Sequence, residues 1–183
     1  KDDDVGLLEL AAPLHDIGKI GIPDSVLLKP GPFSPEERAV MKCHAAIGND
    51  IFKSSHRPLF KMAGVISLQH HEKWDGTGYP LGLSGAKIPL SARIVAVADV
   101  YDALTSKRPY KEAMDHEDAH HIIMEGSGSH FDPDIVVAFD ELFYQFKSVR
   151  MTYHDIDTGP SLFDVVDAAR PTLSTNELLS MLP

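Results

Sequence analysis

The chain has a single cysteine, Cys43, among its 183 residues, so it cannot form an intramolecular disulfide. It also lacks any apolar run close to the roughly 20 residues that a membrane-spanning helix needs. The opening letters KDDDVGLLEL lack the basic stretch that begins a secretory signal peptide. Unpaired thiols are typical of reducing compartments. We therefore predict a cytoplasmic protein that makes no membrane contact.

Basic residues are scarce as well. The chain carries 17 Lys and Arg against 27 Asp and Glu, which gives a formal net charge of −10. A protein that binds DNA or RNA along its phosphates needs a basic surface, so we predict no DNA binding. A small anionic substrate remains compatible with this charge, provided that metal ions or a few local cations offset the general repulsion.

Apolar residues recur at helical spacing over most of the chain, and no stretch alternates clearly enough to predict a strand. The 43% of hydrophobic residues suffices for a proper core, and residues 1–146 are expected to form one domain. The spacing predicts an all-α compact bundle with helices at the opening residues up to about 17 (kinked at Pro13) and at about 34–52, 59–72, 91–104, 115–124 and 133–146. Residues 147–183 are predicted to form a partly helical appendage.

Several polar residues lie on the apolar faces of these helices. The stretch LHDIGKIGIP places an imidazole and a carboxylate side by side at the end of an apolar segment. Burial of a polar group is costly unless a partner is supplied, so such positions indicate an internal site. Six residues from four helices are predicted to converge in the core: His15, Asp16, His44, His70, His71 and Asp99.

This set of side chains favours a metal centre. Helical bundles build metal sites from side chains that project from facing helices. Four imidazoles and two carboxylates exceed the needs of one tetrahedral ion and suit two ions, with Asp16 as the natural bridge. Mixed nitrogen and oxygen ligands favour Fe, Mn, Ni, Co or Zn over Mg or Ca. Two such ions lower the pKa of a bridging water and neutralise phosphoryl oxygens, which indicates phosphodiester hydrolysis.

Some other polar residues are open to two interpretations. Lys19 and Arg108 are candidates for stabilising phosphate charge, or are solvated surface cations. Asp102 lies one turn after Asp99 and either supports a ligand or caps the helix. Arg93 is predicted to be a structural ion-pair donor, and Glu72 and Asp75 to fix the glycine-rich loop DGTGYPLGLSG.

Two features are predicted to have no metal-binding role. The histidines of DHEDAHHIIME, at positions 116, 120 and 121, include a pair at helical spacing, but we expect them on an exposed face. Cys43 is next to His44, about 100° away around the helix. We expect it to be a buried, inert thiol.

Four segments, in order, resemble the motifs of the HD-GYP family, a branch of the HD-domain metal-dependent phosphohydrolases. They are LHDIGKIGIPDSVLLKPGPFSPEERAVMKCH, HHEKWDGTGYPLGLSGAKIP, ARIVAVADVYDALTSKRPYK and GSHFDPDIV, and the resemblance covers about residues 5–145. It implies an all-helical HD fold and two or three divalent transition-metal ions, with Fe or Mn favoured. The implied activity is hydrolysis of cyclic di-GMP to pGpG, in some members onward to GMP.

The resemblance also implies roles by position. The six converging residues match the metal ligands of the family, and Lys19 matches a lysine near the scissile phosphate. Arg108 and Lys111 match residues that hold substrate phosphates. Gly78, Tyr79 and Pro80 match the GYP tripeptide. In members of the family this tripeptide is associated with contacts to GGDEF-domain partners.

The resemblance leaves alternatives open. Family members carry a further histidine, and in trinuclear members a glutamate, on a helix before the position of Lys1. Either such a helix lies upstream in the full-length chain, or one metal lacks a protein ligand. We also expect a sensor or receiver domain in the full-length chain. A catalytically weak cyclic-dinucleotide sensor, or an interaction module that acts through the GYP loop, is the alternative to the enzyme. A hydrolase of another nucleotide fits the GYP and RPYK segments less well. A homodimer is also compatible with the sequence.

Overall fold

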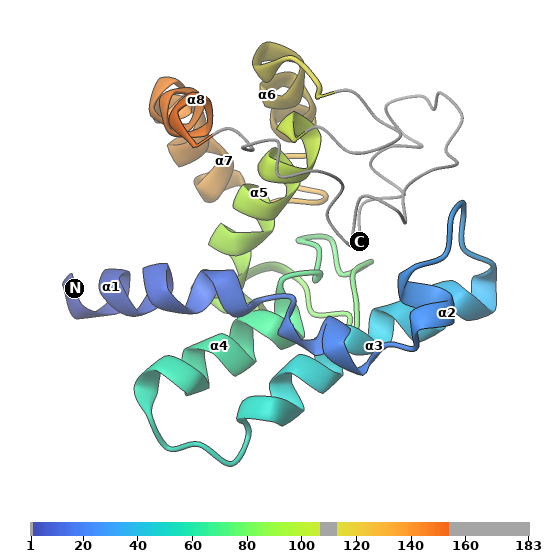
Figure 1. The fold of residues 1–183 in the computed structure, drawn as a ribbon. Helices are drawn as coiled ribbons and strands as arrows, with labels where there is room; N and C mark the ends of the chain where they lie inside the picture. The colour runs from blue at the N-terminus through green and yellow to red at the C-terminus, as the bar shows by residue number, and fades with distance from the viewer. Residues whose placement is uncertain (1, 107–112, 154–183) are drawn as a thin grey trace.

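The structure, a computed structural model, describes residues 2–106 and 113–153, and this part of the chain is helical without a regular strand (Figure 1). Its elements are α1 (Asp2–Ala11), the 3₁₀ turns η1 (Ala12–Leu14) and η2 (Ile17–Gly21), α2 (Asp24–Leu27), α3 (Pro35–Phe52), α4 (Pro58–Gln69), η3 (Gly85–Lys87), α5 (Leu90–Thr105), α6 (His116–Glu125), α7 (Pro133–Glu141) and α8 (Phe143–Thr152). The predicted all-α class is confirmed.

Two of the predicted helices are divided in the structure. The first ends at Ala11 and continues as the 3₁₀ turn η1, which contains Pro13, because proline cannot donate a helical hydrogen bond. The last is split into α7 and α8 at Leu142. Helix α8 runs through residue 147, where the sequence predicts the start of an appendage, and residues 154–183 lie outside the described part.

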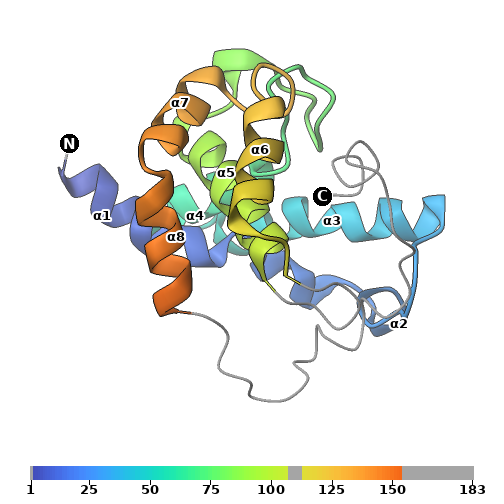
Figure 2. The same cartoon turned by 90° about the horizontal axis from the view of Figure 1, so that it is seen from above.

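The apolar core consists of two clusters that meet along α5. In the first, Ala11 of α1, Ala63 and Ile66 of α4, and Val95 of α5 are buried together. The second joins the following turns of α5 to α6, α7 and α8, around Phe131 and Phe139. Figure 2 shows α5 between α1 and α4 on one side and α6 on the other. Helix α5 therefore ties the two halves of the bundle together.

Helix α3 begins with a complete capping box. The Ser34 hydroxyl accepts from the Glu37 amide, and the Glu37 side chain accepts from the Ser34 amide. Further along, Gly48 lies so close to Ser67 of α4 that an added Cβ would be 2.9 Å from the Ser67 Cβ atom. This close approach places α3 beside α4, so that His44 of α3 lies close to His70, which directly follows α4. None of the described helices is both long enough and apolar enough to cross a bilayer.

Candidate metal centre

The structure brings all six predicted ligand residues together between α3, α4, α5 and the turn that joins η1 to η2. They form two groups of side chains whose nitrogen and oxygen atoms lie within 4.8 Å of one another. One group is Asp16, His44, His70 and His71, and the other is His15, His70 and Asp99. Because His70 belongs to both, the two groups are neighbours in one centre.

A glycine positions the turn that carries His15 and Asp16. A Cβ atom on Gly18 would lie 1.9 Å from the carbonyl oxygen of His44, so this turn packs directly against the main chain of α3. The hydroxyl of Ser67 donates to the carbonyl oxygen of Leu14 at 3.0 Å and fixes the turn to α4 as well. Sequence reasoning did not assign Gly18 this role. Its position two residues after the His-Asp pair was the available signal.

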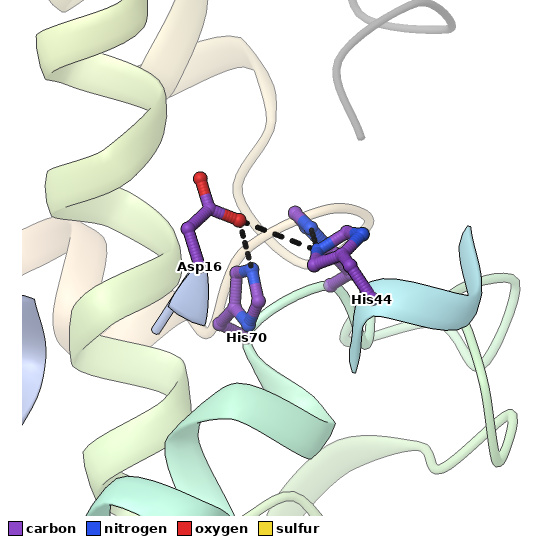
Figure 3. Close-up of side chains that lie close together, drawn as sticks. Asp16, His44 and His70 are labelled. Atoms are coloured by element: carbon purple, nitrogen blue, oxygen red, sulfur yellow. Dashed lines mark hydrogen bonds and ion pairs between the residues drawn. The ribbon is translucent and has the colours of Figure 1, made fainter. Parts of the chain in front are cut away.

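The two oxygens of Asp16 face different neighbours. Oδ2 lies 3.3 Å from Nε2 of His15 and accepts a hydrogen bond of 2.6 Å from Nζ of Lys19. Oδ1 lies 3.3 Å from Nε2 of His44 and 3.8 Å from Nε2 of His70 (Figure 3). A carboxylate divided in this way between two ligand groups has the arrangement that bridging of two cations requires.

Main-chain hydrogen bonds orient three of the histidines. In each, Nδ1 lies within hydrogen-bond distance of a carbonyl oxygen in the preceding turn: 2.9 Å from Ala12 for His15, 2.7 Å from Met41 for His44 and 3.0 Å from Ile66 for His70. We assign the proton to Nδ1, because a carbonyl can only accept. In His44 and His70, Nε2 then carries a lone pair directed into the centre, as is usual for histidines that ligate metals.

Burial and charge set the protonation of the centre. Burial lowers the pKa of His70 to about 4 and lowers that of His71 well below its ordinary range, so both imidazoles are neutral at pH 7. Burial also acts on His15, but the adjacent carboxylates of Asp16 and Asp99 outweigh it and raise its pKa to about 10. Without a cation, a protonated His15 thus compensates part of the carboxylate charge.

Atoms without a hydrogen-bond partner test whether this centre fits a metal. Oδ1 of Asp16 and Nε2 of His70 are buried and have no hydrogen-bond partner in the described part of the chain. Buried acceptors are costly when unsatisfied, and a divalent transition-metal ion would satisfy them together. The donor set therefore fits the predicted kind of cofactor.

The GYP loop is fixed beside the centre. Glu72 is buried, and its carboxylate accepts from the amides of Leu81 at 2.7 Å and Leu83 at 2.9 Å. The ring of Tyr79 packs against His71 with 4.8 Å between centroids. Pro80 and Leu81 are exposed. Tyr79 is thus a wall of the centre, while the residues after it face outward.

The remaining predictions have mixed outcomes. The structural role of Arg93 is confirmed by its ion pair with Asp132, which caps α7. Asp75 is confirmed as a loop-fixing residue through its hydrogen bonds to Thr77. The expectation of a ligand-supporting or capping role for Asp102 is wrong, because its side chain is 69% exposed and faces Arg150. Arg108 and Lys111 lie outside the described residues.

Two further outcomes concern positions near histidines. Cys43 is exposed, which corrects the prediction of a buried thiol, because the 100° step from His44 turns it toward solvent. The three histidines of α6 have separate partners, namely Tyr101 for His116, Asp140 for His120 and Glu125 for His121. His120 is not fully exposed, since its ring packs against Phe143.

Residues 2–135 match the family described as HD domain, and the chain belongs to that family. This confirms the relationship predicted from the four HD-GYP-like segments. The chain is also 52% identical over 156 residues to a protein of Vibrio cholerae serotype O1 named cyclic di-GMP phosphodiesterase, a match that covers 82% of this chain and 32% of the relative. A protein of the same name from Thermotoga maritima is 48% identical over 152 residues, covering 83% of this chain and 41% of the relative.

A third relative has a different named substrate. The 3'3'-cGAMP-specific phosphodiesterase 2 of Vibrio cholerae is 42% identical over 154 residues, which are 84% of this chain and 30% of the relative. The chain thus spans between 30% and 41% of the length of these three relatives.

Proposed function

We propose that this chain is a metal-dependent phosphodiesterase that hydrolyses cyclic di-GMP to pGpG and onward to GMP. The observation that carries the proposal is the pair of unsatisfied, buried acceptors, Asp16 Oδ1 and His70 Nε2, at the junction of two ligand groups. The names of relatives at 48% and 52% identity support the choice of substrate.

The proposal includes two or three divalent transition-metal ions, with Fe or Mn favoured. Their protein ligands would be His15, Asp16, His44, His70, His71 and Asp99. When bound, such ions neutralise phosphoryl oxygens and lower the pKa of a water molecule. The neutral state of His70 and His71 supports this assignment, because only an unprotonated imidazole binds a metal.

The residues of the chain have distinct roles in this proposal. Asp16 would hold the two ligand groups at a fixed separation through its divided carboxylate. Lys19 keeps its ammonium group 2.6 Å from Asp16 at the partly open side of the centre, where it would stabilise the charge of the phosphoryl oxygens and deliver a proton to the leaving oxygen. Arg108 and Lys111 would hold substrate phosphates. Tyr79 would exclude water from behind His71.

The proposed partners follow from the resemblance. A GGDEF-domain protein would contact the loop that carries Gly78, Tyr79 and Pro80. Because the Tyr79 ring faces His71, the contact would be made through Pro80 and through Leu81, whose side chain is 55% exposed. A sensor or receiver domain in the same polypeptide and a cytoplasmic location complete the proposal.

The test combines metal analysis with turnover on one sample. The protein is purified without chelator, its metals are counted per chain by elemental analysis, and conversion of cyclic di-GMP is followed by chromatography. We expect about two ions per chain and the appearance of pGpG or GMP. A metal-loaded protein that converts no cyclic dinucleotide would contradict the enzyme and favour the sensor or interaction module.

A second candidate substrate is 3'3'-cGAMP, which one relative at 42% identity is named for. It is assayed in parallel with cyclic di-GMP at equal concentrations. We expect the higher kcat/KM for cyclic di-GMP, and a reversed order would reassign the substrate.

A further inference from the structure

Three cations gather beside the metal centre, although the chain as a whole is acidic. Arg38 and Lys42 lie four residues apart on α3 and therefore share a face of that helix. Lys73 follows the His70-His71 pair by two residues. We call Arg38, Lys42 and Lys73 the cationic rim.

The ring of Tyr79 connects the rim to the centre. One face of this ring packs against His71, and Nζ of Lys42 lies 4.6 Å from the ring centroid. Burial raises the pKa of the Tyr79 phenol, and the charges of Asp16 and Asp99 raise it further. The opposing effect of Arg38 on the same phenol places this cation within electrostatic range of Tyr79. Lys42 of the rim and His71 of the centre thus both contact one aromatic side chain.

None of the salt bridges in the described part of the chain involves a member of the rim, although Lys73 is partly buried. Glu37, the carboxylate next to Arg38, binds Lys29 and the Ser34 amide instead. Asp75 attracts Lys73 without an ion-pair contact, while Lys42 repels it. The three cations therefore outnumber the carboxylate beside them, and an anionic ligand relieves their repulsion.

We propose that the cationic rim binds the terminal phosphate of the linear dinucleotide pGpG. This inference rests on the proposed function and assigns residues to its second cleavage. In that step one water hydrolyses the remaining P–O3' ester and releases two GMP. The internal phosphodiester must then lie at the metal centre, so the terminal phosphate needs a separate place.

The charge of the ligand favours this assignment over an internal phosphodiester. A phosphate monoester carries a charge of about −1.5 to −2 at pH 7, whereas a phosphodiester carries one. Lysine and arginine form strong, charge-assisted hydrogen bonds to phosphate oxygens. Against a net charge of −10, a local cluster of cations is also what draws a dianion to this surface.

The experiment compares pGpG with GpG, which lacks only the terminal phosphate. For the metal-loaded protein, kcat/KM is measured for both dinucleotides by chromatography of the products. We expect pGpG to be preferred at least tenfold, mainly through KM, because a hydrogen bond to a charged group is typically worth a factor of about ten or more. In Arg38→Gln and Lys42→Gln the preference should fall by about that factor.

Two variants serve as controls. Lys61→Gln removes the same charge from α4, nine residues before His70, and should keep the wild-type preference. Lys42→Arg keeps the charge and should restore it. Lack of preference in the wild type, or a full preference in both Gln variants, would overturn the assignment. If cyclic di-GMP and both linear dinucleotides are not hydrolysed, the proposed function fails, and calorimetric binding of pGpG against GpG still decides whether the rim binds the phosphate.

Discussion

Oδ1 of Asp16 lies 3.8 Å from Nε2 of His70, and within the described residues neither atom has a hydrogen-bond partner. Other polar ring atoms in this centre are satisfied by the main chain, as Nδ1 of His70 is by donating to the carbonyl oxygen of Ile66. The exception falls where the two ligand groups meet. Two unsatisfied buried acceptors are energetically unfavourable unless a cation binds both of them.

Replacement of Asp16 tests its proposed bridging role directly. Asp16→Ala removes both oxygens that face the histidines, so we expect loss of at least one metal ion per chain and a fall in cyclic di-GMP turnover of at least 1,000-fold, on the order of 4 kcal/mol. Metal content by elemental analysis and turnover by chromatography check this. Asp102→Ala is the matched control, because that carboxylate is exposed and should be dispensable. Undiminished turnover in Asp16→Ala would rule out the proposed mechanism.

The packing of Gly18 predicts a large effect of one methyl group. In Gly18→Ala the new Cβ would meet the main chain of His44 and of Gly48, at 1.9 and 2.4 Å from their nearest atoms, so the turn must move. We expect destabilisation of about 2–3 kcal/mol in urea unfolding, together with reduced metal binding. Gly6→Ala has open space on α1 and should instead stabilise by about 0.5–1 kcal/mol. Equal stability of the two variants would contradict the packing described for Gly18.

Glu72 is expected to control the order of the GYP loop. Glu72→Gln leaves one acceptor oxygen and turns an amide group toward the other N–H donor, so one of the two hydrogen bonds to the loop is lost. We predict a loss of about 2 kcal/mol and a change in the fluorescence of Trp74, the single tryptophan of the chain, which directly precedes this loop. Asp75→Asn keeps an acceptor for Thr77 and should change both readouts little. An unchanged Trp74 signal in Glu72→Gln would show that the loop does not depend on this carboxylate.

The lowered pKa of His130 leads us to predict that the folded protein is less stable in acid. Burial, with a smaller effect of Lys73, lowers its pKa from 6.5 to about 4 in the folded protein. The unfolded chain therefore takes up the proton first as the pH falls below about 6.5, and folding stability declines until the pH reaches about 4. Between pH 7 and pH 5 this group should account for about 2 kcal/mol.

The measurement is urea unfolding at both pH values for the wild type and for His130→Asn. Because the histidines of the centre also titrate, only the difference between the two proteins is assigned to His130. The variant should lose about 2 kcal/mol less than the wild type between pH 7 and pH 5. Parallel losses in both proteins would show that His130 is not buried in its neutral form.

The helices could be predicted from the sequence because their apolar spacing and their boundaries are local properties. The convergence of His44, His70 and Asp99 was also accessible, since each lies on an apolar helical face. Helical spacing alone could not show that Asp99 lies in the centre and Asp102 does not, because both residues lie on one face of the helix. The difference depends on tertiary packing, since Asp102 is exposed and lies beside Arg150 of α8. The contact of Gly18 with α3 joins segments 26 residues apart in sequence, and no local pattern encodes it.

Helix α5 gives the centre a property that its ligands alone would not have. Val95 belongs to the cluster built with α1 and α4, while Val97, Val100 and Leu104 belong to the one built with α6, α7 and α8. Asp99 lies among these residues and faces His15, with 3.6 Å between Oδ1 and Nε2. A rotation of α5 against the turn that carries His15 would change that distance. The residence time of a bound ion would then depend on how the two halves of the bundle are aligned.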